Sequence, residues 1–196
     1  MNRVPTQVLR ATQVLRAAQV LRAAPTHDSA PMDLLIVRHA IAFERDAKRW
    51  PDDRARPLTS EGTARARQAA KGLKRLVDRP QRLLTSPLAR AKQTAEILTQ
   101  FAAWPAALDC PALLPDEPPE AALEALRSQP QKLIAVVGHQ PGLGRLIAAC
   151  VPGAVQPQAF ELKKFGVALL SFDGAPRAGR ASLQWLLGPK LLRALR

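Results

Sequence analysis

One short apolar stretch, Leu34 to Ala40, limits the possible folds more than any other part of the chain. It reads Leu-Leu-Ile-Val-Arg-His-Ala, so four apolar residues, two of them β-branched, are followed directly by an arginine and a histidine. A run this short and apolar is typical of a buried strand in a parallel sheet. Ligands of open α/β sheets bind just beyond the carboxyl ends of the strands, where Arg38 and His39 would lie. Such a pair suits an anionic substrate and a nucleophile or base.

A second strand of the same kind is predicted about one hundred residues later. Residues 132–138 read Lys-Leu-Ile-Ala-Val-Val-Gly and end directly before His139, after which a helix is expected to begin near Gly142. Because the carboxyl ends of parallel strands converge on one crevice, His39 and His139 can share a site. The chain has 3 histidines. The remaining one, His27, is expected to be a solvated residue of a linker.

Three arginines are predicted around the same crevice. Arg38 falls at a strand end, Arg56 in a loop that enters a helix, and Arg90 in the first turn of another helix. The planar guanidinium group binds two oxygens of a phosphate at once and keeps its charge at all physiological pH values. Helix N-termini nearby would add main-chain donors for the same anion. The three arginines therefore indicate a site for a phosphoryl group.

The remaining elements alternate between strands and helices, which predicts an α/β fold: a three-layer α/β/α sandwich with a mostly parallel central sheet and antiparallel strands at one edge. The first expected helix, which ends near Val77, is predicted to have Ala64, Ala69, Leu73 and Leu76 on its apolar side. No element is predicted for the basic end, 190–196. Further strands are expected at 82–85, 107–110, 160–163, 167–172 and 182–187, and helices from a Thr59 or Ser60 cap to Val77, from a Ser86 cap to Ala103, and over 120–128.

The two histidines and three arginines suggest a chemistry. A histidine of unperturbed pKa about 6.5 is substantially neutral at pH 7, so it can attack phosphorus without a separate base. The product would be a phosphohistidine, which water then hydrolyses. The arginines would hold the phosphoryl oxygens while the second histidine stabilises the growing charge.

Four stretches of the chain together resemble the histidine phosphatase superfamily, whose fold is phosphoglycerate-mutase-like, and within it the SixA-type phosphohistidine phosphatases. The resemblance extends from Met32 to about Leu187. It implies that His39 is the phosphorylated nucleophile, that Arg38, Arg56 and Arg90 bind the phosphoryl group, and that His139 completes the pocket. It implies no metal and no cofactor. The four stretches are Val37–Ala40 (Val-Arg-His-Ala), Arg56–Thr59 (Arg-Pro-Leu-Thr), Ser86–Thr94 (Ser-Pro-Leu-Ala-Arg-Ala-Lys-Gln-Thr) and Val137–Pro141 (Val-Gly-His-Gln-Pro).

The chain departs from the superfamily pattern in two ways that bear on the substrate. Ala40 stands where the usual motif has glycine, as in many SixA-like members. The acidic residue that protonates the leaving group in the larger sugar-phosphate enzymes has only Asp116 and Glu117 as nearby candidates. A phosphoramidate leaving group is readily protonated and depends less on such an acid, which favours phosphohistidine on a signalling or phosphotransfer protein.

Two alternatives stay open. The first keeps the chemistry but changes the substrate to a small phosphomonoester or a phosphoanhydride. The second is a non-catalytic, basic module that binds polyanions, because the net charge of +13 attracts them. A solvated, arginine-rich surface explains most of this charge as well. With 5 Phe, 3 Trp and no Tyr, the chain offers few platforms for stacking bases, so no specific nucleic-acid partner is expected.

Length and composition limit the organisation of the chain. Its 196 residues suit about one domain. No apolar run is long enough to span a membrane. Cys110 and Cys150 form no ligand-like cluster and are expected to be buried, free thiols, which together with the absence of an evident signal peptide predicts a cytoplasmic protein. A monomer is one oligomeric state that the sequence allows.

The N-terminal part of the chain differs from the rest. Residues 6–23 repeat a six-residue unit, Thr/Ala-Gln-Val-Leu-Arg-Ala, three times in tandem. This period matches neither 3.5 nor 3.6 residues, so its apolar pairs drift around a helix instead of forming one stripe. We expect 1–31 to be a disordered, repetitive extension and linker, and 32–196 to form the histidine phosphatase domain.

Overall fold

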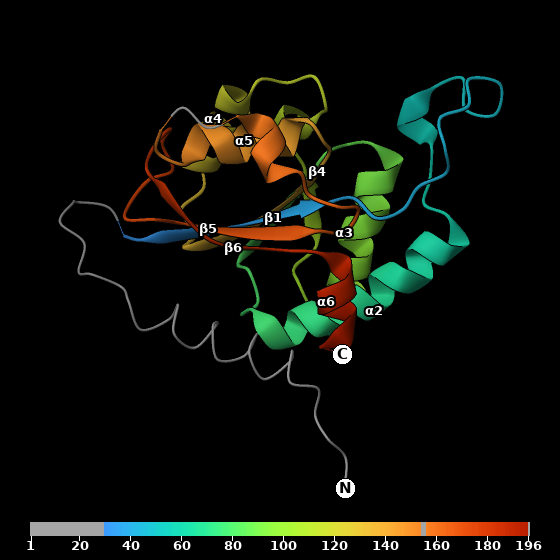
Figure 1. Cartoon of the computed structure of the whole chain (residues 1–196), viewed down its shortest axis with the longest axis horizontal. Helices are drawn as coiled ribbons and strands as arrows, with labels where there is room; N and C mark the ends of the chain where they lie inside the picture. The colour runs from blue at the N-terminus through green and yellow to red at the C-terminus, as the bar shows by residue number, and fades with distance from the viewer. Residues whose placement is uncertain (1–29, 154–155, 196) are drawn as a thin grey trace, which may run out of the picture.

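Residues 30–153 and 156–195 are described in the computed structural model, and Figure 1 draws the others as a grey trace. The repeat at 6–23 and His27 lie outside the described residues, so the predicted extension 1–31 stays a prediction. Among the described helices, none has the length and apolar character needed to cross a membrane.

A six-stranded sheet lies at the centre of the molecule. Its strands are β1 (Met32–Arg38), β2 (Arg82–Thr85), β3 (Ala107–Asp109), β4 (Leu133–Gly138), β5 (Val167–Phe172) and β6 (Ala181–Leu187). The spatial order is β3-β2-β4-β1-β5-β6. The first four of these pair in parallel, whereas β5 runs antiparallel to β1 and β6 runs antiparallel to β5. The predicted sheet, mostly parallel with antiparallel strands at one edge, is therefore confirmed.

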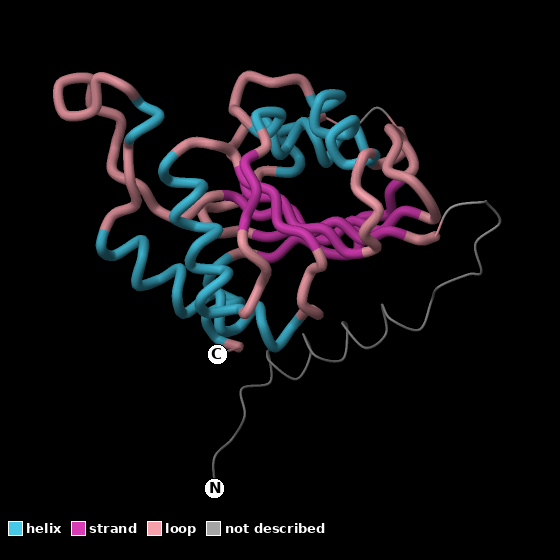
Figure 2. The backbone as a smooth tube through the Cα atoms, turned by 180° about the vertical axis from the view of Figure 1, so that it is seen from behind, coloured by secondary structure: helices cyan, strands magenta, loops and turns pink. Residues whose placement is uncertain are grey.

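Helices cover both faces of the sheet, so the predicted three layers are present (Figures 1 and 2). The helices are α2 (Ser60–Leu76), α3 (Ala89–Ala102), α4 (Pro119–Arg127), α5 (Gly142–Cys150) and α6 (Pro189–Ala194), with short 3-10 turns η1 (Asp53–Ala55), η2 (Pro111–Leu113) and η3 (Pro157–Phe160). Side chains alternate along β1, so Leu34 and Ile36 pack with α4 and α5, whereas Leu35 and Val37 pack with α2, α3 and α6.

Both cysteines belong to the same core, the one between the sheet and helices α4 and α5. Cys110 and Cys150 are free and buried, as predicted. Burial raises the pKa of both thiols, that of Cys150 to about 12. They therefore stay protonated at neutral pH and pack as small apolar side chains.

Three local predictions are wrong. Ala64 is exposed and the buried side of α2 instead includes Ala66, because α3 and α6 cover the helix from that direction. No element is predicted for 190–196, but α6 forms there and buries Leu192. Residues 160–163 form no strand: the segment begins at the end of η3 and continues into a turn.

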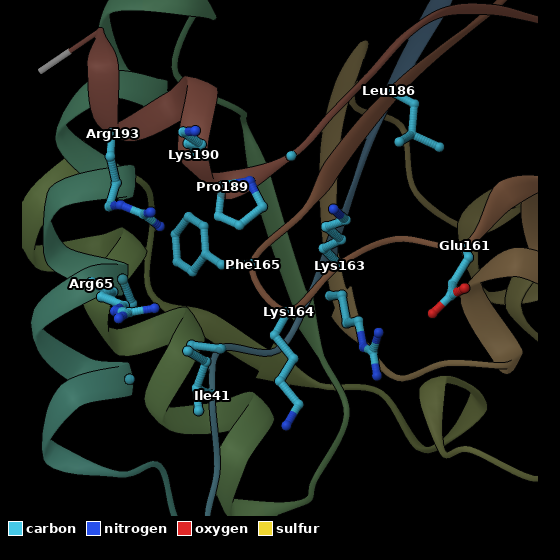
Figure 3. Close-up of a pocket in the computed structure, with 15 residues that line it drawn as sticks. Ile41, Arg65, Glu161, Lys163, Lys164, Phe165, Leu186, Pro189, Lys190 and Arg193 are labelled. Carbon is cyan, nitrogen blue, oxygen red and sulfur yellow. The ribbon is translucent and has the colours of Figure 1, made fainter.

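That turn is held by the end of β1 (Figure 3). Phe165 adopts a left-handed conformation at φ 61°, and the Gly166 N–H donates to the Lys163 carbonyl at 2.5 Å. The Phe165 N–H is shared between the carbonyls of Arg38 and His39, at 3.1 Å from each, and the Arg38 N–H donates to the Gly166 carbonyl. The backbone of the turn thus pairs with the residues that carry the predicted site, and this is why it adds no strand to the sheet.

Gly72 marks a close approach between α2 and α6. A Cβ atom at this position would overlap the Leu192 carbonyl. Gly72→Ala within a helix would ordinarily stabilise by about 1 kcal/mol. Here we expect the reverse, a loss of about 1–3 kcal/mol in the free energy of unfolding measured with urea, because α6 must shift. Lys71→Ala, on the exposed side of the same turn, should change it by less than about 0.5 kcal/mol. Equal stability of Gly72→Ala and the parent protein would contradict the contact.

Candidate active site

The parallel pairing of β1 with β4 brings the two strand-end histidines together. Their register places Arg38 opposite Gly138, and the His39 N–H donates to the Gly138 carbonyl at 3.0 Å. The ring centroids of His39 and His139 lie 5.0 Å apart, with the ring planes tilted by 48°. Both residues are buried, at 7% and 3% exposure. The predicted convergence of the two histidines is therefore observed.

One hydrogen bond fixes the orientation of the His39 ring. Its Nδ1 lies 2.7 Å from the carbonyl oxygen of Ala40. A carbonyl oxygen only accepts hydrogen bonds, so Nδ1 carries the proton in this contact. In the neutral ring this leaves Nε2 with its lone pair exposed for reaction. The short bond to the adjacent residue therefore selects which nitrogen of His39 can act as a nucleophile.

Burial and nearby cations keep both rings neutral. Desolvation lowers the pKa of His39 to about 3, and the charges of Arg90, Arg38 and Lys164 lower it further, against the bond to Ala40. Desolvation likewise lowers the pKa of His139 to about 2, assisted by His39, Arg90, Arg38 and Arg56. At neutral pH, protonation therefore does not block the Nε2 lone pair of His39.

The three predicted arginines come to the same pocket, but their guanidinium groups are already partly engaged. The Nη1 atom of Arg38 donates to the Leu162 carbonyl at 2.6 Å. Arg90, whose side chain is 6% exposed, donates from Nη1 to the Asp53 carbonyl at 2.9 Å. Arg56 donates from Nη1 to the Phe43 carbonyl. Within the described part of the chain, Nε of Arg38 and of Arg90 and Nδ1 of His139 are buried without a hydrogen-bond partner, which suits a pocket that receives an anion.

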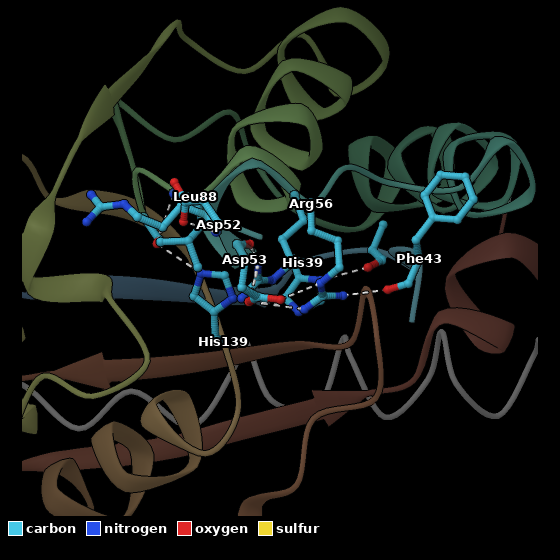
Figure 4. Close-up of polar contacts among 11 residues, drawn as sticks. His39, Phe43, Asp52, Asp53, Arg56, Leu88 and His139 are labelled. Carbon is cyan, nitrogen blue, oxygen red and sulfur yellow. Dashed lines mark hydrogen bonds and ion pairs between the residues drawn. The ribbon is translucent and has the colours of Figure 1, made fainter. Parts of the chain in front are cut away.

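A carboxylate that the sequence prediction missed, Asp53, joins two of these arginines (Figure 4). Its Oδ1 lies 2.7 Å from Nε of Arg56 and its Oδ2 lies 3.2 Å from Nη1 of Arg90. The hydrogen bond from Arg56 and the charge of Arg90 lower the pKa of Asp53, against partial burial. Asp53 thus holds the two guanidinium groups in place and offers them the same kind of acceptor that a phosphoryl group would offer. Its position three residues before Arg56 was the only sequence signal.

Polar residues of α3 and of the preceding loop fix the rest of the pocket. The Ser86 hydroxyl lies 2.9 Å from Nε2 of His139, so it orients that ring and is not the predicted helix cap, for which the structure has Leu88. Thr94 accepts from the Ala40 N–H at 3.0 Å and donates to the Arg90 carbonyl at 2.7 Å. This hydroxyl ties the loop that follows His39 to the helix that carries Arg90.

Gln93, also in α3, connects this helix to the loop that contains Arg56. Its side-chain oxygen accepts from the Leu58 N–H at 2.8 Å. The helix that follows, α2, begins after Thr59, whose hydroxyl accepts from the Gly62 N–H at 2.9 Å, so the predicted cap is confirmed. Gln93 and Thr94 both belong to the stretch Ser86–Thr94, although sequence reasoning gave them no separate role. The motif thus encodes supports for the pocket as well as Arg90.

The pocket is a cavity of about 650 Å³ that also contains the two candidate acids. Asp116 is exposed and Glu117 half-buried in the loop between η2 and α4. Every site residue predicted from the sequence therefore reaches one cavity. Its lining residues are Arg38, His39, Glu44, Arg45, Asp53, Arg54, Arg56, Leu88, Arg90, Leu114, Pro115, Asp116, Glu117, His139, Gln140 and Lys164.

Neutralising Asp53 should strengthen anion binding. Asp53→Asn keeps the shape of the side chain but removes a negative charge beside Arg56 and Arg90. We expect orthophosphate to bind about tenfold more tightly in isothermal titration calorimetry, because one source of repulsion is lost. Asp46→Asn, in the exposed part of the same loop, is the matched control and should leave the affinity unchanged. Weaker binding to Asp53→Asn would mean that the carboxylate mainly positions the arginines.

The low pKa values of the two histidines predict a loss of stability in acid. The unfolded chain takes up a proton on each ring near pH 6.5, whereas the folded protein stays neutral to much lower pH, so the unfolded state binds more protons. The free energy of unfolding should therefore fall below pH 6.5, by up to about 1.4 kcal/mol per pH unit for each histidine. In urea titrations between pH 7.5 and 5, the free energy of unfolding of His139→Gln should fall less steeply with decreasing pH than that of the parent protein. An identical slope in the variant would contradict a neutral, buried His139.

Comparisons with known proteins relate the chain to histidine phosphatases. Residues 34–109 match the model of the histidine phosphatase superfamily, branch 1. The chain is 28% identical to the phosphohistidine phosphatase SixA of Escherichia coli over 165 residues, which is 81% of this chain and 94% of the relative. It is 35% identical to an uncharacterised protein of Picosynechococcus sp. over 156 residues, covering 78% of this chain and 89% of that protein.

Solved structures place the fold in the same group. The protein histidine phosphatase SixA complexed with tungstate superposes with a TM-score of 0.72 at 28% identity, covering 82% of this chain and 99% of that one. A phosphoglycerate mutase of Plasmodium falciparum shares the fold with a TM-score of 0.58 at 17% identity, over 82% and 92% of the two chains. The chain belongs to the histidine phosphatase superfamily and has its phosphoglycerate-mutase-like fold.

Proposed function

We propose that the protein is a phosphohistidine phosphatase that forms a covalent phosphohistidine on His39 and needs no metal or cofactor. Its substrate is a phosphorylated signalling or phosphotransfer protein. The observation that carries this proposal is the state of His39: a buried, neutral ring whose Nδ1 donates to the Ala40 carbonyl and whose Nε2 is free, in a pocket shared with Arg38 and Arg90. The similarity to SixA proteins supports the same choice of substrate.

The first step transfers the phosphoryl group to the enzyme. The lone pair on Nε2 of His39 attacks phosphorus, a new N–P bond forms, and the bond from phosphorus to the substrate histidine breaks. The substrate ring leaves as neutral imidazole if its other nitrogen is protonated. Arg38, Arg90 and Arg56 hold the phosphoryl oxygens, while His139 donates to the same group as negative charge grows.

The second step restores the enzyme. Water attacks the phosphorus of phospho-His39, an O–P bond forms, and the bond to Nε2 breaks with its electron pair returning to the ring. Both protons of the water leave on the departing dihydrogen phosphate, because Nδ1 keeps its own proton and Nε2 regains its lone pair. Bound phosphate is a negative charge beside His139, so it favours protonation of that ring and makes it a better donor at this stage.

The choice of substrate depends on the leaving group. Imidazole leaves readily once protonated, whereas a sugar alkoxide needs a strong acid beside it. The two carboxylates near the mouth, Asp116 and Glu117, lie in a loop, where one is exposed and the other half-buried. Neither carboxylate is therefore enclosed within the pocket, as an acid positioned to protonate an alkoxide would be. This environment favours a phosphoramidate over a sugar phosphate as substrate.

The covalent step can be tested by trapping. The protein is mixed with a histidine phosphotransfer protein that carries radiolabelled phosphate on its histidine, and the reaction is quenched in alkali, in which phosphohistidine survives. We expect transient label on the parent protein and none on His39→Ala. Arg90→Lys should lower kcat/KM about 100-fold, because a point charge cannot replace the two-pronged guanidinium. Arg67→Lys, on the exposed side of α2, is the matched control and should not change it.

The same experiment separates the alternatives. Efficient hydrolysis of p-nitrophenyl phosphate or sugar phosphates, with slow turnover of the phosphoprotein, would point to a phosphomonoesterase. Label on His39→Ala, or near-normal turnover by that variant, would contradict the nucleophile. If no phosphoryl compound is turned over, the protein binds anions without catalysis.

A further inference from the structure

A second basic pocket adjoins the catalytic one. It is a cavity of about 600 Å³ between α2, α6 and the turn before β5 (Figure 3). The two cavities share Arg38 and Lys164 as lining residues, so they meet at the end of β1. None of the four stretches that carry the family resemblance contains the other cationic residues of this pocket, which are Arg65, Lys163, Lys190 and Arg193.

The charges of this pocket are unbalanced. Glu161 is the only carboxylate that lines it within the described part of the chain. Arg65 forms an ion pair with Glu61 on its own helix. Lys163, Lys190 and Arg193 have no carboxylate within ion-pair distance among the described residues. Lys163, Lys190 and Arg193 therefore line one cavity without a carboxylate partner in the part of the chain that the structure describes, which favours binding of anionic groups there.

The floor of the pocket is apolar, and this argues for a protein partner. Ile41 and Pro189, which are half-buried, provide its apolar area beside the buried Phe165, whose ring Figure 3 shows between the cationic side chains of the two helices. An apolar centre with a charged rim is the usual composition of a protein–protein interface. Phe165 is buried at 3% exposure and cannot stack on a nucleic-acid base, so the pocket lacks the platform that single strands require.

From this arrangement we propose that the second pocket binds acidic side chains of the phosphoprotein substrate, next to its phosphohistidine. The proposal rests on the proposed function, because it assigns the recognition of the substrate to a surface beside the catalytic pocket. A phosphoryl group bound at His39 occupies the first pocket, and aspartate or glutamate residues on the same protein surface reach Lys163, Lys190 and Arg193. Small phosphorylated compounds that carry no carboxylate have no group to place in the second pocket.

The test compares two phosphohistidine peptides of equal length, one with glutamates around the histidine and one with glutamines at the same positions. We expect the parent protein to have an about tenfold higher kcat/KM for the acidic peptide, since each exposed ion pair contributes a few-fold. The double variant Lys163→Glu/Lys190→Glu should lose this preference. Its turnover of inorganic phosphoramidate should stay within about twofold of the parent value, because that small substrate uses only the catalytic pocket.

A matched variant controls for the change in net charge. Lys74→Glu/Lys132→Glu reverses two exposed lysines that do not line the pocket, and it should keep the preference for the acidic peptide. High salt should reduce the preference in the parent protein, because the Debye length falls to about 3 Å at 1 M. Equal preference in both double variants, or none in the parent protein, would overturn the proposal.

A binding measurement keeps this test independent of catalysis. Fluorescence anisotropy of the labelled, unphosphorylated acidic peptide should show binding to the parent protein and to the control variant, but weaker binding to Lys163→Glu/Lys190→Glu. If Lys163→Glu/Lys190→Glu weakens peptide binding as expected but the parent protein turns over no phosphoramidate, the result supports the binding pocket and contradicts the proposed function. If a labelled oligonucleotide binds through these lysines while the acidic peptide does not, the pocket serves nucleic acid and the proposal is wrong.

Discussion

The parallel pairing of β1 with β4 is the constraint on which the site depends. Its register sets Arg38 opposite Gly138, so each strand ends at the same level and the next residue of each is a histidine. Residues 34–37 of β1 and 134–137 of β4 are apolar and fully buried under helices on both faces, so a slip of one residue would place every one of these side chains on the wrong face. The packing of the two hydrophobic cores thus fixes the register of the strands, and the register places the ring centroids of His39 and His139 5.0 Å apart.

Support for this arrangement comes from segments far apart in the chain. The turn before β5 bonds to the carbonyls of Arg38 and His39, and the Thr94 hydroxyl bonds to Ala40. These bonds hold the backbone of His39 from two sides, while the Ala40 carbonyl sets the tautomer of its ring. Rigid placement matters for catalysis because a displaced nucleophile loses much of its effective concentration.

Burial of two histidines among arginines has an electrostatic cost that suits an anion site. Desolvation keeps both rings neutral, and the arginines bring positive charge that Asp53 balances only in part. An incoming phosphoryl group would supply the missing negative charge and satisfy the buried Nε atoms of Arg38 and Arg90. The excess of positive charge continues into the neighbouring pocket, which shares Arg38 and Lys164 with the first.

The sequence by itself determined the order of strands and helices from β1 to α5 and the residues that meet at the carboxyl ends of β1 and β4. Apolar runs and helix caps are local signals, so β1, β4, α2 and the histidines that follow the two strands could be read directly. Tertiary structure alone decided that Asp53 meets Arg90, that Ser86 meets His139 and that the turn before β5 meets the end of β1, because these partners lie 37 to 128 positions apart in the chain and a contact at such separation leaves no local pattern. It also decided that α6 closes over Gly72 and that Lys163 and Lys190 share a pocket, since packing of distant segments, not the propensity of either, brings those residues together.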